Sequence, residues 1–389
     1  MVDLVTERSA SPGLAAPPLR ALAVSKTYRT PDHIGRLVLE RIDFVLREGE
    51  IVAILGKSGS GKSTFLRTLS GLVAPSEGRV EYRGGPVTRP VRGVAMVFQS
   101  FALFPWLTVL GNVELGLEAQ GVSAAERRRR AVDAIDLIGL DGFESAYPKE
   151  LSGGMRQRVG FARALVVNPD ILLLDEPFSQ LDVLTAETLR NDLLELWMRS
   201  RIPTKGILMV SHNIEEAVEM ADRILIFSSD PGRISAEVPV ALQRPRSPES
   251  APFRLIMDQV YTLLTTVPGR DGRRGAKPEP IGFGYRLPDA AVQQVSGLID
   301  TLKEPPYSGR ADLPQLADGE NLVMDELFPL IELLQLLGWA LVSAGDIELT
   351  AGGRGYAAAD MLTRKQRSEE RRVGKECSSP CRSRWSPYH

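Results

Sequence analysis

The stretch GKSGSGKS at residues 56–63 limits what this chain can fold into more than any other feature. It follows the apolar run 51–55, which predicts a buried strand, and precedes residues 64–69, whose apolar side chains fall on one side of a predicted helix. Glycines let consecutive backbone N–H groups turn inward around a phosphate, and the helix adds the positive end of its dipole. The pattern predicts a polyphosphate site in which Lys62 reaches the β- and γ-phosphates and the Ser63 hydroxyl binds Mg²⁺.

Three further apolar runs predict strands, of which those at 171–174 and 206–211 are predicted to be buried. Each is followed by polar side chains: Gln99 after residues 93–98, Asp175 and Glu176 after 171–174, and His212 after 206–211. Ligands of open α/β sheets bind at the C-terminal ends of the strands. At such an edge Asp175 can hold Mg²⁺ through water, Glu176 can deprotonate an attacking water, and Gln99 can reach the metal or that water. His212 could contact a γ-phosphate there, or it could be a structural hydrogen-bonding residue.

A second helix start follows at residues 151–158, where Ser152, Gly153 and Gly154 open a predicted helix over 155–167. Free N–H groups at this helix start offer another anion site. One chain cannot easily wrap two helix N-termini around one γ-phosphate. A second copy of the chain that lends its site is the economical solution.

Alternation of apolar and polar residues at 19–25 and 41–47 predicts two half-exposed antiparallel strands, with Tyr28 between them. The Tyr28 ring could stack on a base or serve only in packing. The aromatic-rich residues 100–107 predict either a buried cluster or a docking surface. Four arginines at 127–130 share their predicted helix with acidic residues, so we favour a solvated face over a nucleic-acid site.

Length and composition bound the rest of the chain. At 389 residues with 43% apolar content, it is long enough for two or more domains. Residues 1–18 are rich in Ala, Pro and Ser and carry charges, which predicts a disordered arm and not a signal peptide. The sequence has no uncharged apolar run of the ~18 residues that a membrane helix needs.

Residues 367–389 resemble the translation of a common sequencing adapter, and they contain Cys377 and Cys381, the only two cysteines. We therefore predict a non-native tail and exclude it from the fold. A basic tail or a two-cysteine metal site is the alternative. Without this tail the chain has no cysteine, which suits a reducing compartment.

Taken together, the motifs resemble the nucleotide-binding subunit of an ATP-binding cassette (ABC) transporter over about residues 19–240. In that family, residues 56–63 correspond to the Walker A loop, Gln99 to the Q-loop, residues 151–155 to the signature sequence, and 179–182 to the D-loop. Asp175 and Glu176 correspond to the Walker B pair, His212 to the switch histidine and Tyr28 to the adenine-stacking aromatic residue. The implied ATP-binding residues are Tyr28, Gly56, Lys57, Ser58, Gly59, Ser60, Gly61, Lys62, Ser63, Thr64, Ser152, Gly153, Gly154 and Asp182. The implied Mg²⁺ ligands are Ser63, Gln99 and Asp175, and the implied catalytic residues are Glu176, His212, Gln99 and Lys62.

The resemblance also implies a fold and partners. The expected fold is an α/β P-loop ATPase with a mixed sheet, an antiparallel β subdomain and a helical subdomain at about 100–167. Residues 104–109 and the methionine after the signature glycines resemble the nitrate, sulfonate, taurine and bicarbonate importers. The expected partners are a second ATP-binding subunit, transmembrane permease subunits and, indirectly, a periplasmic or lipoprotein solute-binding protein, with the chain peripheral on the cytoplasmic face of the inner membrane. A soluble ABC-type ATPase not coupled to transport is the alternative.

Two positions depart from the family pattern. Gly111 stands where an acidic residue commonly precedes the asparagine, and Gln180 stands where a small residue is usual in the D-loop. Neither removes a catalytic group.

The domain boundaries follow from these assignments. We predict the cassette over residues 19–250, a helix and flexible linker over 251–282, and a small, mostly α domain over 283–366 that resembles a winged helix and is cut short by the tail. A winged helix invites comparison with DNA-binding regulators. Residues 283–366 carry six basic against twelve acidic side chains, however, and the predicted recognition helix 321–337 has no Lys or Arg. The sequence thus predicts a protein-contacting regulatory or dimerising module without nucleic acid as a partner.

Overall fold

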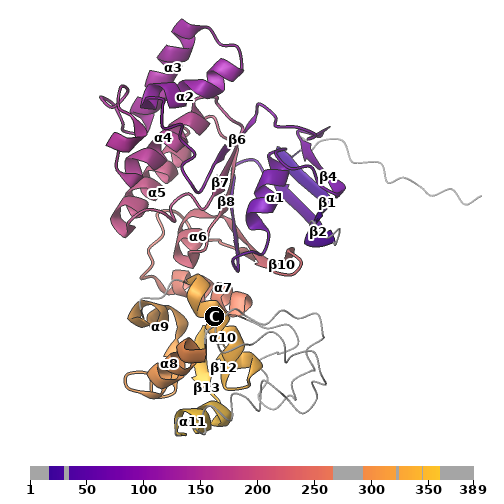
Figure 1. The fold of residues 1–389 in the computed structure, drawn as a ribbon, viewed down its shortest axis with the longest axis vertical. Coiled ribbons are helices and arrows are strands. Elements are labelled where there is room, and N and C mark those ends of the chain that lie inside the picture. Colours follow the sequence, from indigo (N-terminus) through magenta and orange to yellow (C-terminus); the bar gives the residue numbers. More distant parts are fainter. Residues whose placement is uncertain (1–16, 30–34, 266–291, 321–323, 344, 360–389) are drawn as a thin grey trace, which may run out of the picture. The chain divides into compact units, whose positions relative to one another are not determined.

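The computed structural model describes residues 17–29, 35–265, 292–320, 324–343 and 345–359. They form two compact units, the first with residues up to 212 and 216–244, the second with 213–215 and residues from 245 onward (Figure 1). Most of the predicted arm, the predicted linker from 266 on, and the predicted tail lie outside the described residues, as does the closing part of the C-terminal domain from 360 on.

A six-stranded sheet in the order β10-β9-β3-β8-β7-β6 forms the centre of the first unit. Its strands are β3 (Glu50–Gly56), β6 (Val94–Val97), β7 (Ile171–Asp175), β8 (Gly206–Val210), β9 (Arg223–Ser228) and β10 (Arg233–Pro239). All are parallel except the edge strand β10. Every residue of β3, β7 and β8 is buried, as expected for parallel strands covered on both faces, which confirms these three predicted buried strands. The predicted strand at 93–98 corresponds to β6, where Val94, Ala95 and Met96 are half-buried.

A second, antiparallel sheet has the order β2-β1-β4-β5, with β1 (Leu19–Arg29), β2 (Gly35–Leu46), β4 (Glu77–Tyr82) and β5 (Gly85–Pro86). The two predicted antiparallel strands are confirmed, but both extend further than the alternation indicates. Pairing continues to Arg29 and Gly35, so Tyr28 lies within β1 and not in the connection where the sequence placed it.

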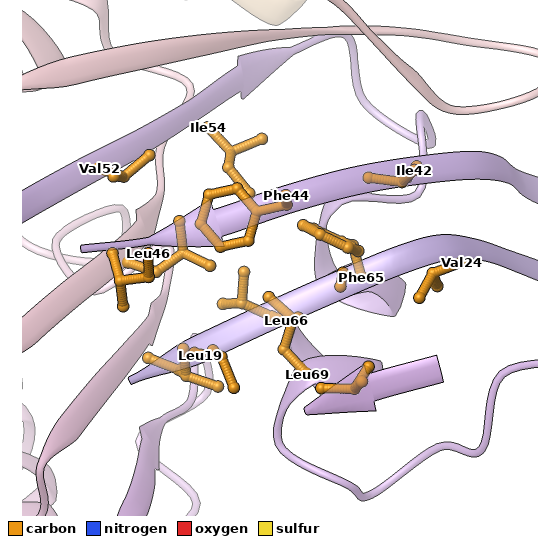
Figure 2. Packing of buried hydrophobic residues seen from close by; sticks show 14 of the residues in the cluster. Leu19, Val24, Ile42, Phe44, Leu46, Val52, Ile54, Phe65, Leu66 and Leu69 are labelled. Atoms are coloured by element: carbon orange, nitrogen blue, oxygen red, sulfur yellow. The ribbon is translucent and has the colours of Figure 1, made fainter. Parts of the chain in front are cut away.

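Helix α1 (Lys62–Leu69) follows the glycine-rich loop and packs between the two sheets. Figure 2 shows Phe65, Leu66 and Leu69 of α1 against side chains of both β layers. The Phe65 ring is fully buried and lies 5.8 Å from the Phe44 ring and 5.6 Å from the Phe227 ring, between centroids. This apolar contact fixes the helix whose N-terminus forms the predicted phosphate site.

Helices α2 (Val109–Ala119), α3 (Ala124–Leu137) and α4 (Gly153–Leu165) gather at the opposite end of the unit from the antiparallel sheet (Figure 1). They form the predicted helical subdomain, and α5 (Val183–Met198) and α6 (Ile214–Met220) complete the unit. Arg129 pairs with Glu126 and Asp133 at 2.8 and 3.1 Å, which agrees with a solvated face on α3.

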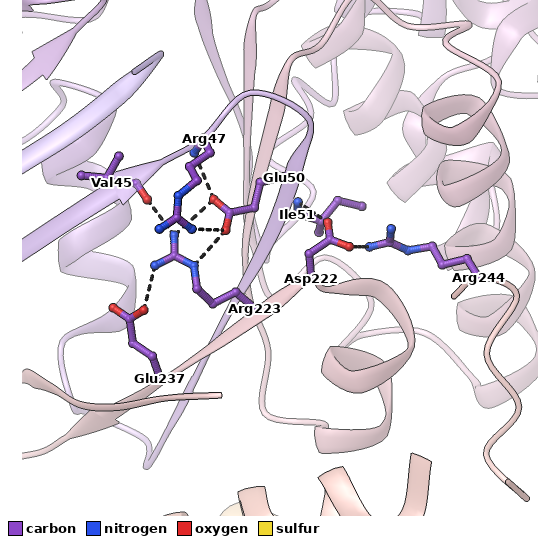
Figure 3. Close-up of polar contacts among 8 residues, drawn as sticks. All are labelled: Val45, Arg47, Glu50, Ile51, Asp222, Arg223, Glu237 and Arg244. Carbon is purple, nitrogen blue, oxygen red and sulfur yellow. Dashed lines mark hydrogen bonds and ion pairs between the residues drawn. The ribbon is translucent and has the colours of Figure 1, made fainter. Parts of the chain in front are cut away.

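Paired charged side chains lie at the N-terminal end of β3 (Figure 3). Glu50 accepts from Arg223 at 2.8 Å, and Arg223 also pairs with Glu237 at 3.0 Å. Asp222 accepts from the backbone N–H of Ile51 at 2.9 Å and pairs with Arg244 at 2.7 Å. Because these buried or half-buried charges are paired, their desolvation is offset, and β3 is held to β9 and β10 at the end remote from the loop.

The second unit contains α7 (Ala251–Thr265), α8 (Val292–Lys303), β11 (Arg310–Asp312), α9 (Leu313–Glu320), α10 (Met324–Leu336), β12 (Ala340–Ser343), β13 (Asp346–Leu349) and α11 (Ala351–Ala357). Its sheet has the order β11-β13-β12. From α8 on, this helix–strand–helix–helix–strand–strand order is that of a winged helix. The predicted recognition helix at 321–337 corresponds to α10. Strand β11 and helix α9 were not predicted, because they are short and follow a loop without clear periodicity.

Helix α10 is the buried centre of this second unit. Leu327, Ile331 and Leu334 are fully buried, and the Gln335 amide donates to the Thr265 carbonyl of α7 at 3.0 Å. The helix at the recognition position thus packs against α7, the helix that precedes the domain, as well as against α8 and β12. Within the described ranges, no helix is both long and apolar enough to cross a membrane.

Helix α6 begins two residues after His212 and carries a buried carboxyl group. Burial raises the pKa of Glu216 to about 7, and the Ser211 hydroxyl that donates to it, together with Arg190 and His212, lowers it only in part. Arg190 is itself engaged with Glu219 at 2.6 Å. The folded protein thus holds a proton on Glu216 that the unfolded chain releases at lower pH.

We predict that the stability of the first unit falls as the pH rises from about 4.5, the ordinary glutamate value, to about 7. The sign follows because the folded state binds more protons than the unfolded chain in this window, so the stabilisation is complete below about 4.5 and lost above about 7. Glu216→Gln should remove this slope and gain up to roughly 3 kcal/mol over wild type at pH 8. Thermal melts from pH 5 to 8 measure it. Glu215→Gln, exposed on the same helix, is the control and should keep the wild-type slope.

Candidate active site

The loop at residues 56–63 has the conformation that its glycines predict. Gly59 and Gly61 have φ angles of 76° and 93°, in the left-handed region, and a Cβ on Gly61 would lie 2.8 Å from a methyl group of Leu39. The buried Lys62 ammonium donates to the carbonyls of Gly56 at 2.6 Å and Lys57 at 3.0 Å, so it lies across the loop.

One hydroxyl in the loop has no partner. The Ser60 Oγ is buried and makes no hydrogen bond within the residues that the structure describes. Because buried polar atoms are almost always satisfied in folded proteins, this orphaned group fits a loop built to meet a polar ligand.

Strand register brings the four predicted site segments to one edge of the sheet. Ile54 pairs with Val210, Asp175 pairs with Val210 on the other side, and Val97 pairs with Leu174. Since these strands are parallel, the residues that follow them meet at the same C-terminal edge. Motifs that lie far apart in the sequence are therefore close together in the fold.

The Ser63 hydroxyl and the Asp175 carboxylate are in direct contact. Ser63 Oγ donates to Asp175 Oδ1 at 2.8 Å, and Asp175 is almost fully buried. Burial raises the pKa of Asp175, while Ser63 and the Arg67 guanidinium, 3.9 Å from Oδ2, act against that rise. Both groups present hard oxygen atoms of the kind that Mg²⁺ prefers, so this pair fits that ion.

Glu176 lies at the meeting point of Gln99 and His212. The Gln99 Nε2 donates to the Glu176 carboxylate at 2.7 Å, and the His212 Nδ1 lies 3.6 Å from Oε2. The neighbouring His212 holds the pKa of Glu176 below its ordinary value against the opposing effect of burial. Glu176 therefore carries its charge at neutral pH, as a general base must.

The backbone of Glu176 is strained. Its φ angle is 47°, which is uncommon for a residue with a side chain and is tolerated mainly where surrounding contacts hold it. Its N–H donates to the Val210 carbonyl at 3.0 Å. This geometry turns the chain sharply after β7 and directs the carboxylate toward Gln99 and His212.

Gln99 was expected to be a metal ligand; its side chain contacts Glu176, and its role at a metal stays a prediction. The Ser63 and Asp175 oxygens fit the ion, Asp175 through water. Within the described residues, no three His, Cys, Asp or Glu side chains are grouped to hold a metal, in keeping with a site made from one carboxylate, a hydroxyl and, by expectation, phosphate oxygens.

Tyr28 lies near the loop and is available on one face. It pairs with Arg36 on β2, two residues before Val38, whose atoms surround Gly61. The ring is 41% exposed, and the Lys26 ammonium lies 5.0 Å from its centroid. Partial exposure favours the stacking interpretation over packing alone.

The signature residues contact another part of the chain. Ser152 caps α4 by accepting from the Met155 N–H at 3.2 Å, and Asp182 caps α5 by accepting from the Thr185 N–H at 3.0 Å. The nearest neighbours of a Cβ on Gly153 or Gly154 belong to residues 180–185 and not to the phosphate loop. Within one chain, the second predicted anion site thus stands beside the D-loop.

Arg67 near Asp175 was missed from the sequence. It lies on α1, four residues after Ser63, and this helical spacing places it on the same side as the Ser63 hydroxyl. A basic residue at that spacing after the loop was the available signal.

Two families match the chain. Residues 39–179 match the ABC transporter family, and residues 314–375 match the C-terminal AAA-associated domain. The second match extends beyond residue 366, where we place the end of the native domain, so the adapter-like origin of residues 367–375 stays a prediction.

Several relatives align with more than two thirds of their own length. An uncharacterized ABC transporter ATP-binding protein of Methanocaldococcus jannaschii is 42% identical over 226 residues, 58% of this chain and 84% of the relative. The nitrate import ATP-binding protein NrtD of Synechocystis is 46% identical over 206 residues (53% and 76%). The taurine import ATP-binding protein TauB of Burkholderia pseudomallei is 48% identical over 198 residues (51% and 75%).

A solved structure resembles the first part of the chain. It is the dimeric post-hydrolysis state of the ATP-binding cassette MJ0796 with ADP and Pi, 34% identical with a TM-score of 0.52, and it aligns over 58% of this chain and all of that chain. The matching family, the relatives and the assembled motifs agree, and the chain therefore belongs to the ATP-hydrolysing ATP-binding subunits of ABC transporters.

Proposed function

We propose that this chain powers a membrane importer for a small anion or organic solute of the nitrate, sulfonate and taurine class. The relatives named as nitrate and taurine import subunits support the class. The catalytic part of the proposal rests on contacts at one edge of the sheet. Ser63 contacts Asp175 there, and Glu176 contacts Gln99 and His212.

In this proposal the chain's own residues bind the nucleotide, orient the attacking water and take a proton from it. Backbone N–H groups of residues 58–64 and the Lys62 ammonium hold the phosphates, and Tyr28 stacks on the adenine. Glu176 takes a proton from the attacking water, Gln99 orients that water, and His212 stabilises the transferring phosphoryl group. Mg²⁺, held by Ser63 and, through water, Asp175, supplies neutralisation of phosphate charge.

A second copy of the chain completes each site. Ser152, Gly153 and Gly154 stand at a capped helix start beside the D-loop, where they are available to an ATP held by the partner. The dimeric state of the similar cassette supports an assembly of two copies. ATP then favours the closed dimer and hydrolysis reopens it, a population shift passed to the permease subunits.

The alternative, an ABC-type ATPase not coupled to transport, has the same site chemistry. The neighbouring genes discriminate between the importer and the uncoupled ATPase. Genes for a six-helix membrane protein and a secreted binding protein beside this one would indicate an importer. Peripheral attachment to the cytoplasmic face of the membrane follows from the importer proposal alone.

Glu176→Gln is expected to lower ATP turnover by about 10² to 10⁴, because an amide cannot take the proton from water. ATP binding should remain, and a nucleotide-bound dimer should accumulate. Steady-state ATPase assays, nucleotide binding and size-exclusion chromatography with ATP measure these effects. Glu187→Gln, on an exposed position of α5, is the control. Wild-type turnover in a folded Glu176→Gln protein would refute the assignment.

The loop at 104–108 has the properties of a docking surface. Trp106 and Phe104 are 70% and 41% exposed, and their rings lie 5.3 Å apart between centroids. The buried Asn112 accepts from the Phe104 N–H at 2.8 Å and donates to the carbonyls of Phe104, Leu107 and Thr108. A buried amide thus fixes a loop that exposes two aromatic rings, which favours docking over a buried cluster.

Phe104→Ser with Trp106→Ser is expected to leave the melting temperature and the basal ATPase rate near wild type while abolishing solute uptake with the permease. The reason is that Trp106 is mostly exposed and Phe104 is partly exposed in the isolated chain. Co-purification with the permease and uptake into reconstituted vesicles are the measurements. Phe143→Ser, at a similarly exposed aromatic residue, serves as the matched control. A large loss of stability in the double variant would favour the packing role.

For the second unit we propose a regulatory or dimerising role through protein contacts. Winged helices that read DNA present the recognition helix to the major groove. Here α10 is largely buried among α7, α8 and β12, and the buried Glu332 and the exposed Glu326 lie on it. Neither the accessibility nor the charge of this helix suits a phosphate backbone.

The full chain is expected to show no shift of duplex DNA at ~150 mM salt in an electrophoretic assay. A chain that ends at residue 250 should differ from the full chain in ATPase rate or in self-association. Salt-resistant DNA binding, or identical ATPase and association with and without the second unit, would contradict this role.

A further inference from the structure

Gln157 is a polar residue at a position that packing alone would give to an apolar side chain. It lies on α4, five residues after Ser152, and is fully buried. Gly154, Phe161 and Ala164 on the same face of the helix are buried as well. A buried amide costs free energy unless it is hydrogen-bonded, so its place here needs a polar partner.

That partner is the carbonyl of the residue that follows the catalytic glutamate. The Gln157 Nε2 donates to the Pro177 carbonyl at 2.5 Å. Since Pro177 has no N–H, this carbonyl is the only backbone hydrogen-bonding group of the residue. The Gln157 Oε1 is buried and has no partner within the described part of the chain. The Gln157 amide N–H group is therefore hydrogen-bonded and its oxygen is not, so the hydrogen bond to the Pro177 carbonyl is the polar contact that holds this side chain.

The segment that Gln157 holds is strained. Glu176 has a φ of 47°, and its N–H is fixed by the Val210 carbonyl. Its own carbonyl accepts from the Ser179 hydroxyl at 3.0 Å. The contact from Gln157 adds a restraint from a different element to the residue after Glu176. Strained conformations persist where such contacts over-determine them.

We propose that Gln157 is a positioning residue for the general base: it holds the Glu176–Pro177 turn in the conformation that directs the Glu176 carboxylate at water. The inference rests on the proposed role of Glu176. Because α4 also begins with the signature turn, Gln157 could instead act on the nucleotide that the partner holds. A test must separate these two directions.

The first arm compares Gln157→Met with Thr204→Val. Met fills a similar volume without a donor. Thr204 is the matched control, since it is also buried and its hydroxyl donates to a proline carbonyl, that of Pro169 at 3.2 Å, at the other end of β7. Gln157→Met is expected to lower kcat about 10- to 100-fold with KM for ATP unchanged, because small misplacements of catalytic groups have effects of this size. Thr204→Val should keep the wild-type kcat.

The second arm places the substitution on one side of a mixed dimer made from differently tagged chains. Each dimer keeps a single Glu176, because the other chain carries Glu176→Gln. When Gln157→Met lies on the chain that keeps Glu176, turnover should fall as in the first arm. When Gln157→Met lies on the chain that carries Glu176→Gln, the active site of the other chain is altered only in the signature helix that faces it. Turnover should then match that of the reference dimer without Gln157→Met.

The outcomes are separable. Equal rates in both mixed dimers, a loss confined to the signature side, or a wild-type kcat in Gln157→Met would overturn the proposal. So would a kcat loss that Thr204→Val shares. Gln157→Leu gives a second test if Gln157→Met melts at a much lower temperature than wild type. Absence of ATPase activity in the wild-type chain would instead refute the proposed function, and this result is visible before any variant is compared.

Discussion

The complete burial of β3 is the constraint on which the rest of the first unit depends. All seven of its residues are buried, so every backbone group must pair within the protein, and β8 and β9 meet this need on both sides. Once the strand is enclosed, the chain can leave it only at an edge of the sheet, where the glycines allow the tight loop around Lys62. The same burial draws Phe65 between the two sheets and fixes α1 (Figure 2). Phosphate binding thus follows from the way a central strand must end.

The two ends of the six-stranded sheet differ: ion pairs stabilise its N-terminal end, and the predicted site residues lie at its C-terminal end. At the N-terminal end, Glu50 with Arg223 and Asp222 with Arg244 are paired charges that tie strands together (Figure 3). At the C-terminal end, the polar groups are only partly satisfied among themselves: the Ser60 hydroxyl has no partner in the described residues, and Glu176 has a strained backbone. Such departures from the usual rules are expected where a ligand completes the interactions. The C-terminal end is therefore where we expect the ligand.

Sequence reasoning succeeded where one physical signal dominated. Continuous apolar runs identified the buried parallel strands, and the polar residues after them identified the site, because parallel strands end at one edge. It failed where the outcome depended on tertiary contact. Tyr28 lies in β1 because pairing with β2 continues past the alternating segment, and β11 and α9 are too short to show a period. Gln157 shares a helix face with Gly154, Phe161 and Ala164, so a polar residue in an apolar row was a visible signal. Its partner, a backbone carbonyl twenty residues away, was not.

The second unit shows why strand and helix order does not decide function. Its order from α8 to β13 is that of a winged helix, yet α10 also packs against α7, which lies before the winged-helix elements in the chain, besides α8 and β12. Charge alone had already argued against DNA, because the predicted recognition helix lacks cations. Burial now gives an independent reason, because every residue from Leu327 to Leu337 is buried or half-buried, so the helix offers little surface to a groove. We therefore expect a partner to contact another surface of the unit.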